Sequence, residues 1–297
     1  RYLMPNLLPL FLRLIGVRKI IITLHGFGLY TWLGKLRLSL PALFSDGIIT
    51  VSQHIKKTAE RFWRSPWGFL KTKLEETVFT GSSIEPNSEV PASRKSDLKK
   101  KWGVKPSQLA ISYFGFINEG KGFDDLLRAL STCLDQGLPC HLVCLADFTP
   151  DRDAYHLKMK QLLDRLNLGG QVTFTGYLCQ QEAAEALASC DYAVLPFNYG
   201  ASTKRSSLLA ALACGCPVIT TSDDSLPPFF ENGKNIVLVP PRNPVRLAEA
   251  MMFLGKDPAL LQEIRERTKS LAGYFSWDKI AEKHYQIYRK HLKRGIK

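Results

Sequence analysis

The sequence predicts an α/β protein built on parallel sheets. Short runs rich in β-branched residues alternate along the chain with segments of helical period. Most of these runs are continuously apolar, which is typical of parallel strands buried on both faces. The length of 297 residues and the 45% share of hydrophobic residues are sufficient for two domains with sizeable cores. We therefore expect parallel sheets covered by helices on both sides.

Nine segments have the composition of strands. In chain order these are Lys19–Leu24, Gly47–Val51, Thr77–Thr80, Leu109–Phe114, Cys140–Leu145, Gln171–Thr175, Tyr192–Leu195, Pro217–Thr221 and Ile236–Val239. Helical periods are clear in Phe123–Gln136, Asp153–Leu166 and Glu182–Ser189. The Leu-rich opening, Tyr2–Val17, is interrupted by prolines and an arginine, and we interpret it as a buried helix and its approach.

A polar stretch divides the chain. Glu85–Ser96 (EPNSEVPASRKS) is rich in Pro, Ser and charge and has no apolar period, so we place a domain boundary there. About three βα units precede it and about six follow, and six make a complete doubly wound domain. We predict a partial N-terminal domain over residues 1–90, a C-terminal domain over 91–276, and a basic helix over 277–297 that packs back toward the N-terminal domain. Because the chain begins at Arg1, we expect residues before it.

The basic charge is concentrated in the first part of the chain. Residues 1–105 hold 18 Lys and Arg against 7 Asp and Glu, whereas residues 106–297 hold 22 against 20. This asymmetry suggests either an anionic partner, such as a membrane surface, or a solvated basic surface. Without a recognition motif, nucleic acid is not an expected partner. The stretch Arg61–Lys73 interleaves cations with Trp and Phe, which suits a membrane interface or a helix end whose aromatics fill the core.

The cysteines and the scattered acids do not predict a metal or disulfide site. The cysteines are odd in number, lie in the neutral part of the chain and form no C-x-x-C pair, so we expect buried thiols in a reducing cytoplasm. We interpret Asp223-Asp224, Asp151, Asp153 and His156 as solvated residues rather than metal ligands. No apolar run reaches the roughly 18 residues of a membrane-spanning helix. We expect a cytoplasmic protein, with a peripheral position at the inner face of the membrane as the more specific alternative.

A glycine-rich loop follows the strand that opens the second domain. It is Tyr113–Gly122 (YFGFINEGKG), in which Gly115, Gly120 and Gly122 allow close backbone approach and Lys121 adds a cation before a helix. These are the properties that a phosphate group requires. The loop matches neither the G-x-x-x-x-G-K-[ST] nor the G-x-G-x-x-G pattern, so an ordinary exposed lysine remains the alternative.

A second candidate loop lies in the stretch FNYGASTKRSSLLAALACGCP, residues 197–217. Ser202 or Thr203 can cap the helix that follows, which would put Lys204 and Arg205 in its first turn. The helix dipole disfavours cations there, so their presence suggests that an anion also binds. A pyrophosphate would accept hydrogen bonds from the backbone N–H groups and from both cations.

Several weak motifs, taken together, resemble one family. In chain order they are Ile22–Gly26 (ITLHG), Ser45–Ser52 (SDGIITVS), Val78–Ile84 (VFTGSSI), Gly115 with Lys121-Gly122, Val172–Tyr177 (VTFTGY), Cys190–Pro196 (CDYAVLP), Leu208–Pro217 (LLAALACGCP) and Phe275–Trp277 (FSW). Their order and spacing resemble the group-1 (family four) glycosyltransferases of GT-B fold. The resemblance implies two Rossmann-like α/β domains facing a cleft, with the acceptor in the N-terminal domain and a nucleotide-diphosphate sugar in the C-terminal one.

The resemblance also implies residue roles. Lys121 would contact the donor diphosphate, Tyr177 would lie near the nucleobase, and His25 would face the sugar and the acceptor. His25, Lys121 and Arg205 are the candidate catalytic residues. The candidate donor-binding residues are Gly115, Phe116, Lys121, Gly122, Tyr177, Ser202, Thr203, Lys204, Arg205 and Ser206.

The chain departs from the family pattern at three positions. Phe116 stands where the family often has an arginine, and the two acids of its E-x(7)-E motif would fall at Ser202 and Ala210. Some bacterial members resemble this chain and have a basic loop instead, so Lys204 and Arg205 would replace the carboxylates and strengthen diphosphate binding.

The resemblance implies a retaining hexosyltransferase that needs neither a metal nor a cofactor. It would move a hexose from a nucleotide-diphosphate sugar to a lipid-linked or cell-surface glycan acceptor, as in polysaccharide biosynthesis. The alternative is a non-catalytic nucleotide-binding module of the same fold, or a truncated inactive remnant.

Overall fold

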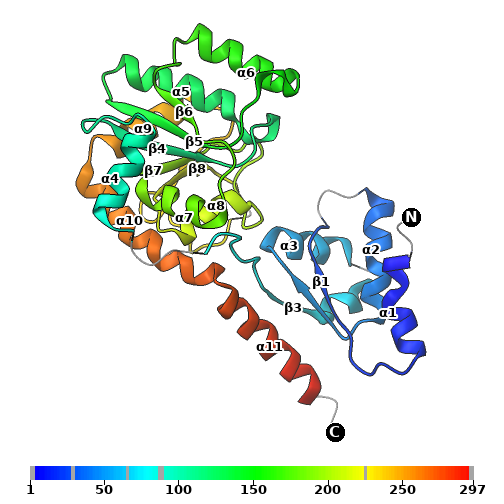
Figure 1. Cartoon of the computed structure of the whole chain (residues 1–297). Coiled ribbons are helices and arrows are strands. Elements are labelled where there is room, and N and C mark those ends of the chain that lie inside the picture. The colour runs from blue at the N-terminus through cyan, green and yellow to red at the C-terminus, as the bar shows by residue number, and fades with distance from the viewer. Residues whose placement is uncertain (1–3, 28–30, 65–66, 86–89, 224–225, 294–297) are drawn as a thin grey trace. The chain divides into compact units, whose positions relative to one another are not determined.

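The computed structural model describes residues 4–27, 31–64, 67–85, 90–223 and 226–293. Two compact units are present, one of Arg1–Gly81 with Trp277–Lys297 and the other of Ser82–Ser276 (Figure 1). Within the described residues each unit has one parallel sheet, of three strands in the first and six in the second. The predicted α/β class with parallel sheets is confirmed.

The first unit has a sheet in the order β1-β2-β3. Its elements are α1 (Met4–Leu14), β1 (Ile21–Leu24), α2 (Trp32–Phe44), β2 (Gly47–Thr50), α3 (Gln53–Phe62), a 3-10 helix (Trp67–Lys73), β3 (Leu74–Thr77) and α11 (Trp277–Lys293). Adjacent residues of β2 point to opposite faces of the sheet. Ile48 packs with Ile55 of α3, whereas Ile49 packs with Ile280 and Ile287 of α11. The last helix of the chain therefore covers one face of this sheet.

Two predictions for this unit were wrong. β3 lies at Leu74–Thr77 and not at Thr77–Thr80, because Leu74 and Thr77 are the residues in register with β2. Burial of Glu75 is possible there because His291 Nε2 lies 2.7 Å from its carboxylate and Lys290 Nζ lies 2.6 Å from it. Helix α1 is not buried, since it exposes the apolar side chains of Leu8, Phe11, Leu14 and the following Ile15.

The aromatics of Arg61–Lys73 divide between the core and the surface. Trp63 is fully buried and donates from Nε1 to Ser39 Oγ at 2.6 Å, whereas Phe69 is half exposed. Residues 65–66 lie outside the described residues. Trp63 thus fits the interpretation of this stretch as a helix end whose aromatics fill the core.

The second unit is a doubly wound sheet in the order β6-β5-β4-β7-β8-β9. Its longer elements are α4 (Ala92–Lys101), β4 (Leu109–Phe114), α5 (Phe123–Asp135), β5 (Cys140–Leu145), α6 (Ala154–Arg165), β6 (Val172–Phe174), α7 (Gln180–Ser189), β7 (Tyr192–Leu195), α8 (Ser206–Ala213), β8 (Val218–Thr221), β9 (Val237–Val239), α9 (Pro244–Gly255) and α10 (Pro258–Ala272). Helices α5, α6 and α9 cover one face, and α4, α7, α8 and α10 cover the other (Figure 1).

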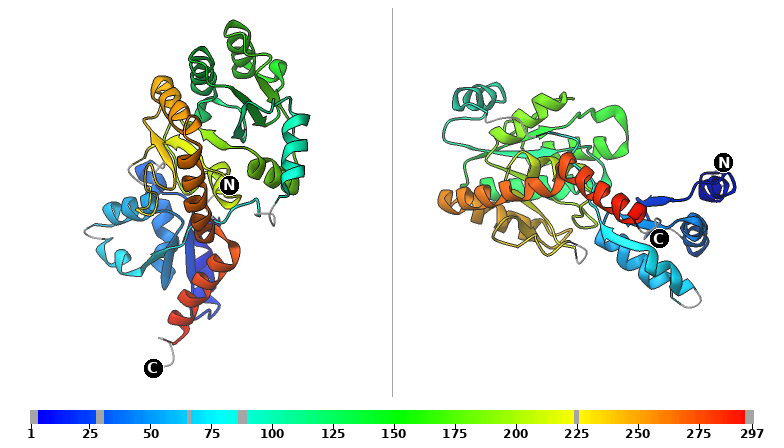
Figure 2. Two further views of the ribbon diagram at one scale, coloured as in Figure 1. Left: turned by 90° about the vertical axis from the view of Figure 1, so that its left-hand side faces the viewer. Right: turned by 90° about the horizontal axis from the view of Figure 1, so that it is seen from below.

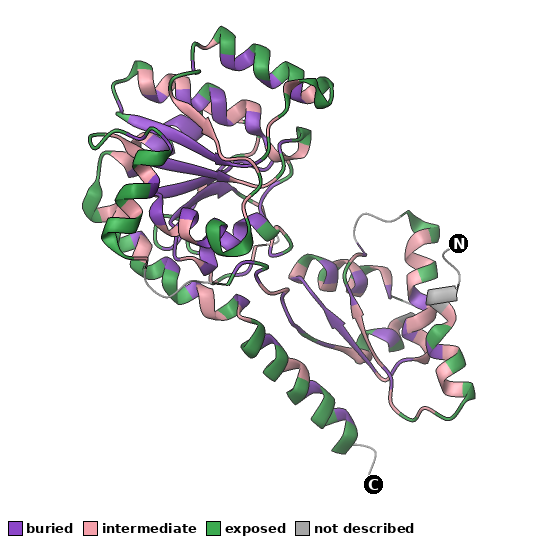
Figure 3. Cartoon of the chain, viewed as in Figure 1, coloured by how far each residue is buried: buried purple, intermediate pink, exposed green. Residues whose placement is uncertain are grey.

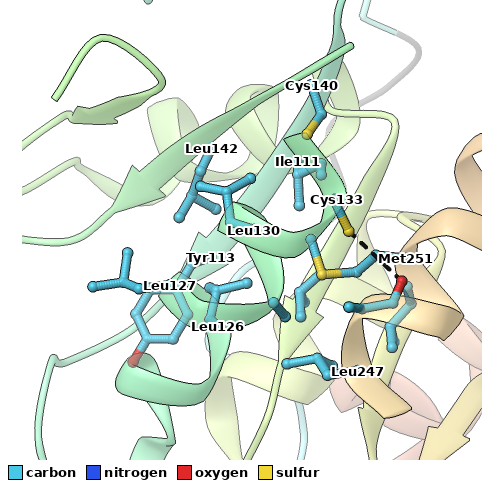
Figure 4. Packing of buried hydrophobic residues seen from close by; sticks show 14 of the residues in the cluster. Ile111, Tyr113, Leu126, Leu127, Leu130, Cys133, Cys140, Leu142, Leu247 and Met251 are labelled. Atoms are coloured by element: carbon cyan, nitrogen blue, oxygen red, sulfur yellow. Dashed lines mark hydrogen bonds between the residues drawn. The ribbon is translucent and has the colours of Figure 1, made fainter. Parts of the chain in front are cut away.

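The core of the second unit is built on its central strands, which are buried along their length (Figure 3). Every residue of β5 is buried, because β4 and β6 flank it and helices cover both faces. On one face, Leu127 and Leu130 of α5 pack with Met251 of α9, and Cys133 Sγ donates to Ala248 O at 3.6 Å (Figure 4). This packing anchors α5, whose N-terminus follows the glycine-rich loop.

The units divide at Gly81/Ser82 and at Ser276/Trp277, whereas the polar stretch Glu85–Ser96 predicts the first division at residue 90. The N–H of Ser82 donates to Phe275 O at 3.0 Å, and Ile84 is buried, so this segment belongs to the second unit. At the second division the chain passes from α10, through a 3-10 helix at Gly273–Phe275, into α11 (Figure 2).

Candidate active site

The candidate site lies where the order of strands reverses in the larger sheet. Strands β4 and β7 are neighbours, but the chain continues from β4 to β5 on one side and from β7 to β8 on the other. Loops that follow such a pair of strands diverge, and ligands of open α/β sheets bind in the crevice between them. Here the two loops are residues 115–122 and residues 196–205.

The two loops interlock. Gly122 has a φ of 65°, and a Cβ on it would lie 2.0 Å from Pro196 O, so the backbones approach closely there. Asn198 donates its backbone N–H to Gly120 O at 3.3 Å and its side-chain amide to Glu119 O. Segments that are distant in the sequence thus form one assembly.

Three cations gather at this assembly. Lys121 Nζ lies 5.0 Å from the ring centroid of Phe197, and Arg205 Cζ lies 4.9 Å from the same centroid. Burial, followed by the charge of Arg205, lowers the pKa of Lys121 to about 8. The same two causes lower the pKa of Lys204. Burial lowers the pKa of Arg205, while the charge of Asp223 acts in the opposite direction.

Within the described residues, none of these three cations forms an ion pair with an acid within 4 Å. Burying positive charge without a close counter-ion costs free energy. A bound anion would offset that cost.

Helix α8 begins later than predicted. A turn at Thr203-Lys204, closed by a 3.0 Å hydrogen bond from Arg205 N–H to Ser202 O, delays the helix until Ser206. Arg205 is therefore the N-cap, and the prediction that Ser202 or Thr203 caps the helix, with the cations in its first turn, was wrong. Arg205 makes no side-chain cap hydrogen bond, and within the described residues no side chain accepts from the N–H groups of the first turn, which suit an anion.

Ser207 is a site residue that none of the sequence motifs indicates. It is 2% exposed, and its Oγ is the buried side-chain oxygen left without a hydrogen-bond partner in the described part of the chain. A Cβ built on Gly115, whose φ is 120°, would lie 3.7 Å from this Oγ and 3.9 Å from Lys121 Nζ. The Ser207 hydroxyl and the Lys121 ammonium group therefore both border the space beside Gly115. In the sequence, the only signal for an inward-facing Ser207 is its position relative to the apolar residues of the helix that follows.

A cavity of about 510 Å³ extends from this point, entirely within the second unit. Gly115, Lys121 and Ser207 line its polar part. The remaining lining is largely apolar, with an Arg152–Asp147 ion pair at the surface: Ser83, Ile84, Phe114, Phe116, Leu145, Ala146, Asp147, Arg152, Gly176, Tyr177, Leu178, Gln180, Ala183 and Ser206. One part thus suits a diphosphate and the other a nucleoside.

Five predicted donor-binding residues line this cavity, namely Gly115, Phe116, Lys121, Tyr177 and Ser206. The other five do not line it, namely Gly122, Ser202, Thr203, Lys204 and Arg205. Gly122 and Arg205 contribute to the interlocked assembly, whereas Thr203 is buried. His25 is exposed just beyond β1 in the first unit, and its role stays a prediction.

The interpretation of His156 as solvated was wrong. It is 2% exposed, because α6 turns it inward against Phe148, whose ring stacks on it at 5.4 Å. Asp151 and Asp153 are exposed, and Asp153 caps α6 by accepting from the N–H of His156. Asp224 lies outside the described residues. Among the described residues, no three His, Cys, Asp or Glu side chains gather as a metal ion would require.

Comparison with known proteins identifies the family. Residues 108–257 match the family described as "Glycosyl transferases group 1", which is half of the chain. The chain therefore belongs to the group 1 glycosyl transferases, and the resemblance inferred from its motifs is confirmed. The matched segment contains both loops of the site.

Two relatives by sequence illustrate the likeness. The chain is 28% identical over 202 residues to a D-inositol 3-phosphate glycosyltransferase of Streptomyces bingchenggensis (strain BCW-1), covering 67% of this chain and 44% of that protein. It is 22% identical over 198 residues to an alpha-D-kanosaminyltransferase of Streptomyces kanamyceticus, covering 66% and 49%. The chain thus spans about half the length of these relatives.

The fold has solved counterparts. Anabaena Alr3699/HepE in complex with UDP superposes with a TM-score of 0.80 at 18% identity, covering 97% of this chain and 77% of that one. The same protein in complex with UDP-glucose gives a TM-score of 0.75 at 19% identity, covering 97% and 77%. Together with the two parallel sheets, this likeness defines the GT-B class that the sequence predicted.

Proposed function

We propose that the second unit binds a nucleotide-diphosphate sugar and that the protein transfers its sugar to an acceptor. The observation that carries this proposal is the convergence of Ser207 Oγ and Lys121 Nζ on the space beside Gly115. A partnerless buried hydroxyl and a desolvated ammonium group both gain a partner from one phosphate oxygen. The family membership and the UDP-bound neighbour support the same placement.

The chemistry we propose is electrostatic. As the bond between sugar and diphosphate breaks, negative charge grows on the departing diphosphate. Lys121, Arg205 and the N–H groups at the start of α8 are already in place and stabilise that charge without reorganisation. The nucleoside would lie against the apolar part of the cavity, with Tyr177 near the base. The transfer would proceed with retention and without a metal ion, and His25 would face the sugar and the acceptor.

We propose a hexose donor of the UDP-glucose type and a lipid-linked or cell-surface glycan as the acceptor. The neighbour solved with UDP-glucose supports this choice of donor. The first unit, Arg1–Gly81 with Trp277–Lys297, would bind the acceptor, and the second unit, Ser82–Ser276, would bind the donor. The basic first part of the chain suits an anionic membrane surface at the cytoplasmic side. In the described part of the chain, no helix has the length and hydrophobicity to span a bilayer.

One observation favours a second function, a nucleotide-binding module without catalysis. Ala210 is fully buried and Ser202 is neutral, so neither position offers a carboxylate to a donor. Contacts to the charged part of the donor would then rest on the cations, the Ser207 hydroxyl and the backbone, without a carboxylate. Such a module would bind nucleoside diphosphates but would not turn over a donor sugar.

Calorimetric titration tests the proposal. The whole chain is titrated with UDP, GDP, ADP and dTDP, and Lys121→Met is titrated in parallel. We expect one nucleoside diphosphate to bind the wild-type chain and to bind Lys121→Met at least about tenfold more weakly, the effect of a lost charged hydrogen bond. Absence of binding by all four would refute the proposal.

Turnover separates the two functions. The chain is incubated with the sugar derivative of the nucleotide that binds, and release of the nucleoside diphosphate is measured with and without a lipid-linked glycan acceptor. Acceptor-dependent release supports the transferase. Binding without release supports the non-catalytic module.

A further inference from the structure

The backbone of the glycine-rich loop is held on one side. The carbonyls of residues 116–120 all accept hydrogen bonds: from Tyr113 Oη at 2.9 Å, His156 Nε2 at 3.1 Å, Lys121 N–H at 3.0 Å, the Asn198 side-chain amide and Asn198 N–H at 3.3 Å. By contrast, the N–H groups of residues 116–118 donate to no other group in the described part of the chain. The loop thus has satisfied carbonyls and free amides.

Two of these carbonyls are held by buried side chains that belong to other elements. Tyr113 of β4 is 1% exposed and donates to Phe116 O, and His156 of α6 is 2% exposed and donates to Ile117 O. Tyr113 packs beside Leu127 in the core (Figure 4), so its hydroxyl is held by a rigid ring. His156 is held by the Phe148 ring and by contacts of Nδ1 with Thr149, 3.3 Å from its N and 3.0 Å from its O.

The donor role of His156 Nε2 follows from its partner. Nε2 lies 3.1 Å from Ile117 O, and a carbonyl oxygen accepts hydrogen bonds but cannot donate one. Nε2 therefore has to bear the hydrogen. The bond to Ile117 O requires only this hydrogen on Nε2. The ring acts on the loop as a donor, as the Tyr113 hydroxyl does.

Holding a carbonyl determines the direction of the next amide. The peptide group is planar and trans, so the C=O of one residue and the N–H of the next point in opposite directions. The bond from Tyr113 to Phe116 O therefore directs the Ile117 N–H away from the core. The bond from His156 to Ile117 O directs the Asn118 N–H in the same way.

We infer that Tyr113 and His156 are positioning residues for the diphosphate of the donor. They hold two successive peptides of the loop with their N–H groups free for an anion, and they prevent the carbonyls from turning toward it. Neither residue touches the ligand. This inference rests on the proposed function for the identity of the ligand, but not for the anion preference of the loop.

The chain offers closely matched variants. Tyr113→Phe removes only the hydroxyl, and Tyr155→Phe is its control, because Tyr155 Oη donates to Asp124 Oδ1 at 3.3 Å and not to the loop. His156→Gln keeps an N–H donor at the place of Nε2. His156→Asn keeps polar atoms only near Thr149 and loses the donor to Ile117 O.

The probes are inorganic pyrophosphate and the nucleoside diphosphate that binds the wild-type chain, with Kd measured by calorimetry. We expect Tyr113→Phe and His156→Asn to raise both Kd values about fivefold to tenfold, as loss of one hydrogen bond would. We expect His156→Gln and Tyr155→Phe to remain within about twofold of the wild type. Rescue by Gln but not by Asn is a readout that a purely structural role of His156 would not produce.

The outcomes separate the two proposals. Wild-type Kd values in Tyr113→Phe and His156→Asn overturn the positioning role and leave the proposed function intact. The expected pattern with pyrophosphate, but no nucleoside diphosphate bound, supports the positioning role and refutes the function. Binding of neither probe by the wild type refutes both. Thermal unfolding checks the fold of each variant, and if His156→Asn does not fold, Tyr113→Phe and His156→Gln decide.

Discussion

The two loops of the candidate site differ in what they contribute. The conformation of residues 115–122 is fixed by the positive φ angles of Gly115 and Gly122 and by side chains that donate hydrogen bonds to successive carbonyls of the loop. Residues 196–205 provide two cations and lead to a helix without a side-chain cap. The first loop supplies geometry and the second supplies charge, with Lys121 as the cation that the first loop brings to the second. The two should therefore fail differently when they are altered.

The largest effect is expected where the loops touch. In Gly122→Ala the new Cβ would meet Pro196 O at 2.0 Å and the residue would keep a left-handed φ. We expect the free energy of unfolding to fall by about 3 kcal/mol or more, measured by urea denaturation. Gly120→Ala is the control in the same loop, since its Cβ would meet nothing nearer than 3.5 Å. Equal stability of the two variants would show that the loops do not interlock.

Removal of the charges should weaken binding without destabilising the fold, because the buried cations have no close counter-ion. Lys121→Met and Arg205→Met each remove one cation over the Phe197 ring, and we expect each to weaken nucleoside diphosphate binding about 10- to 100-fold. Turnover should fall by orders of magnitude in both. Lys160→Met is the control, because Lys160 is an exposed cation of α6 that pairs with Asp164. If only one of the two variants binds more weakly, the charge that holds the nucleoside diphosphate comes from that residue's loop alone.

The pH dependence of binding should sharpen the contribution of Lys121. Its pKa is lowered to about 8, so the ammonium is charged below that pH and loses its proton above it, whereas a bound anion favours the charged form. We expect the affinity for the nucleoside diphosphate to fall about tenfold between about pH 7.5 and 9.5, measured by calorimetry. Lys121→Arg, whose guanidinium stays charged, should bind with a flat profile over this range. A wild-type profile that is also flat would contradict the prediction.

The smallest effect is expected at Ser207, and it should have opposite signs with and without ligand. Ser207→Ala removes a buried hydroxyl that has no partner, so we expect the ligand-free chain to gain about 1 kcal/mol in the free energy of unfolding. The same change should raise the Kd of the nucleoside diphosphate about fivefold. Ser206→Ala, which alters the exposed neighbour, is the control for stability. A loss of stability in Ser207→Ala would mean that the hydroxyl is already satisfied.

The strands were largely predictable because their apolar runs are local. The third strand was not, since LEET is mostly polar, and Glu75 is buried only through Lys290 and His291, which are more than 200 residues away in the sequence. A carboxylate that is covered by side chains so distant in the sequence leaves no local pattern. Here burial acts to raise the pKa of Glu75, but the hydrogen bonds and charges of Lys290 and His291 outweigh it and lower the pKa.

The site was predictable at its glycines and cations but not at its supporting residues. Gly115 and Lys121 could be named from residue type and motif spacing. The start of α8 depends on a turn at Thr203-Lys204 that competes with the helix, and helix patterns do not reveal such a turn. Ser207 and His156 matter only through what they approach in three dimensions, and their types alone do not indicate that.

The first unit is discontinuous in the sequence, and this affects the order in which the two units can fold during synthesis on the ribosome. Residues 82–276 form one continuous segment, so their sheet can close as soon as they emerge. The face of β2 that bears Ile49 has to wait for Ile280 and Ile287, and Glu75 has to wait for Lys290 and His291. Residues 21–77 are thus synthesised before residues 82–276 but their sheet is completed after them, and until then an apolar strip remains uncovered for chaperones to bind.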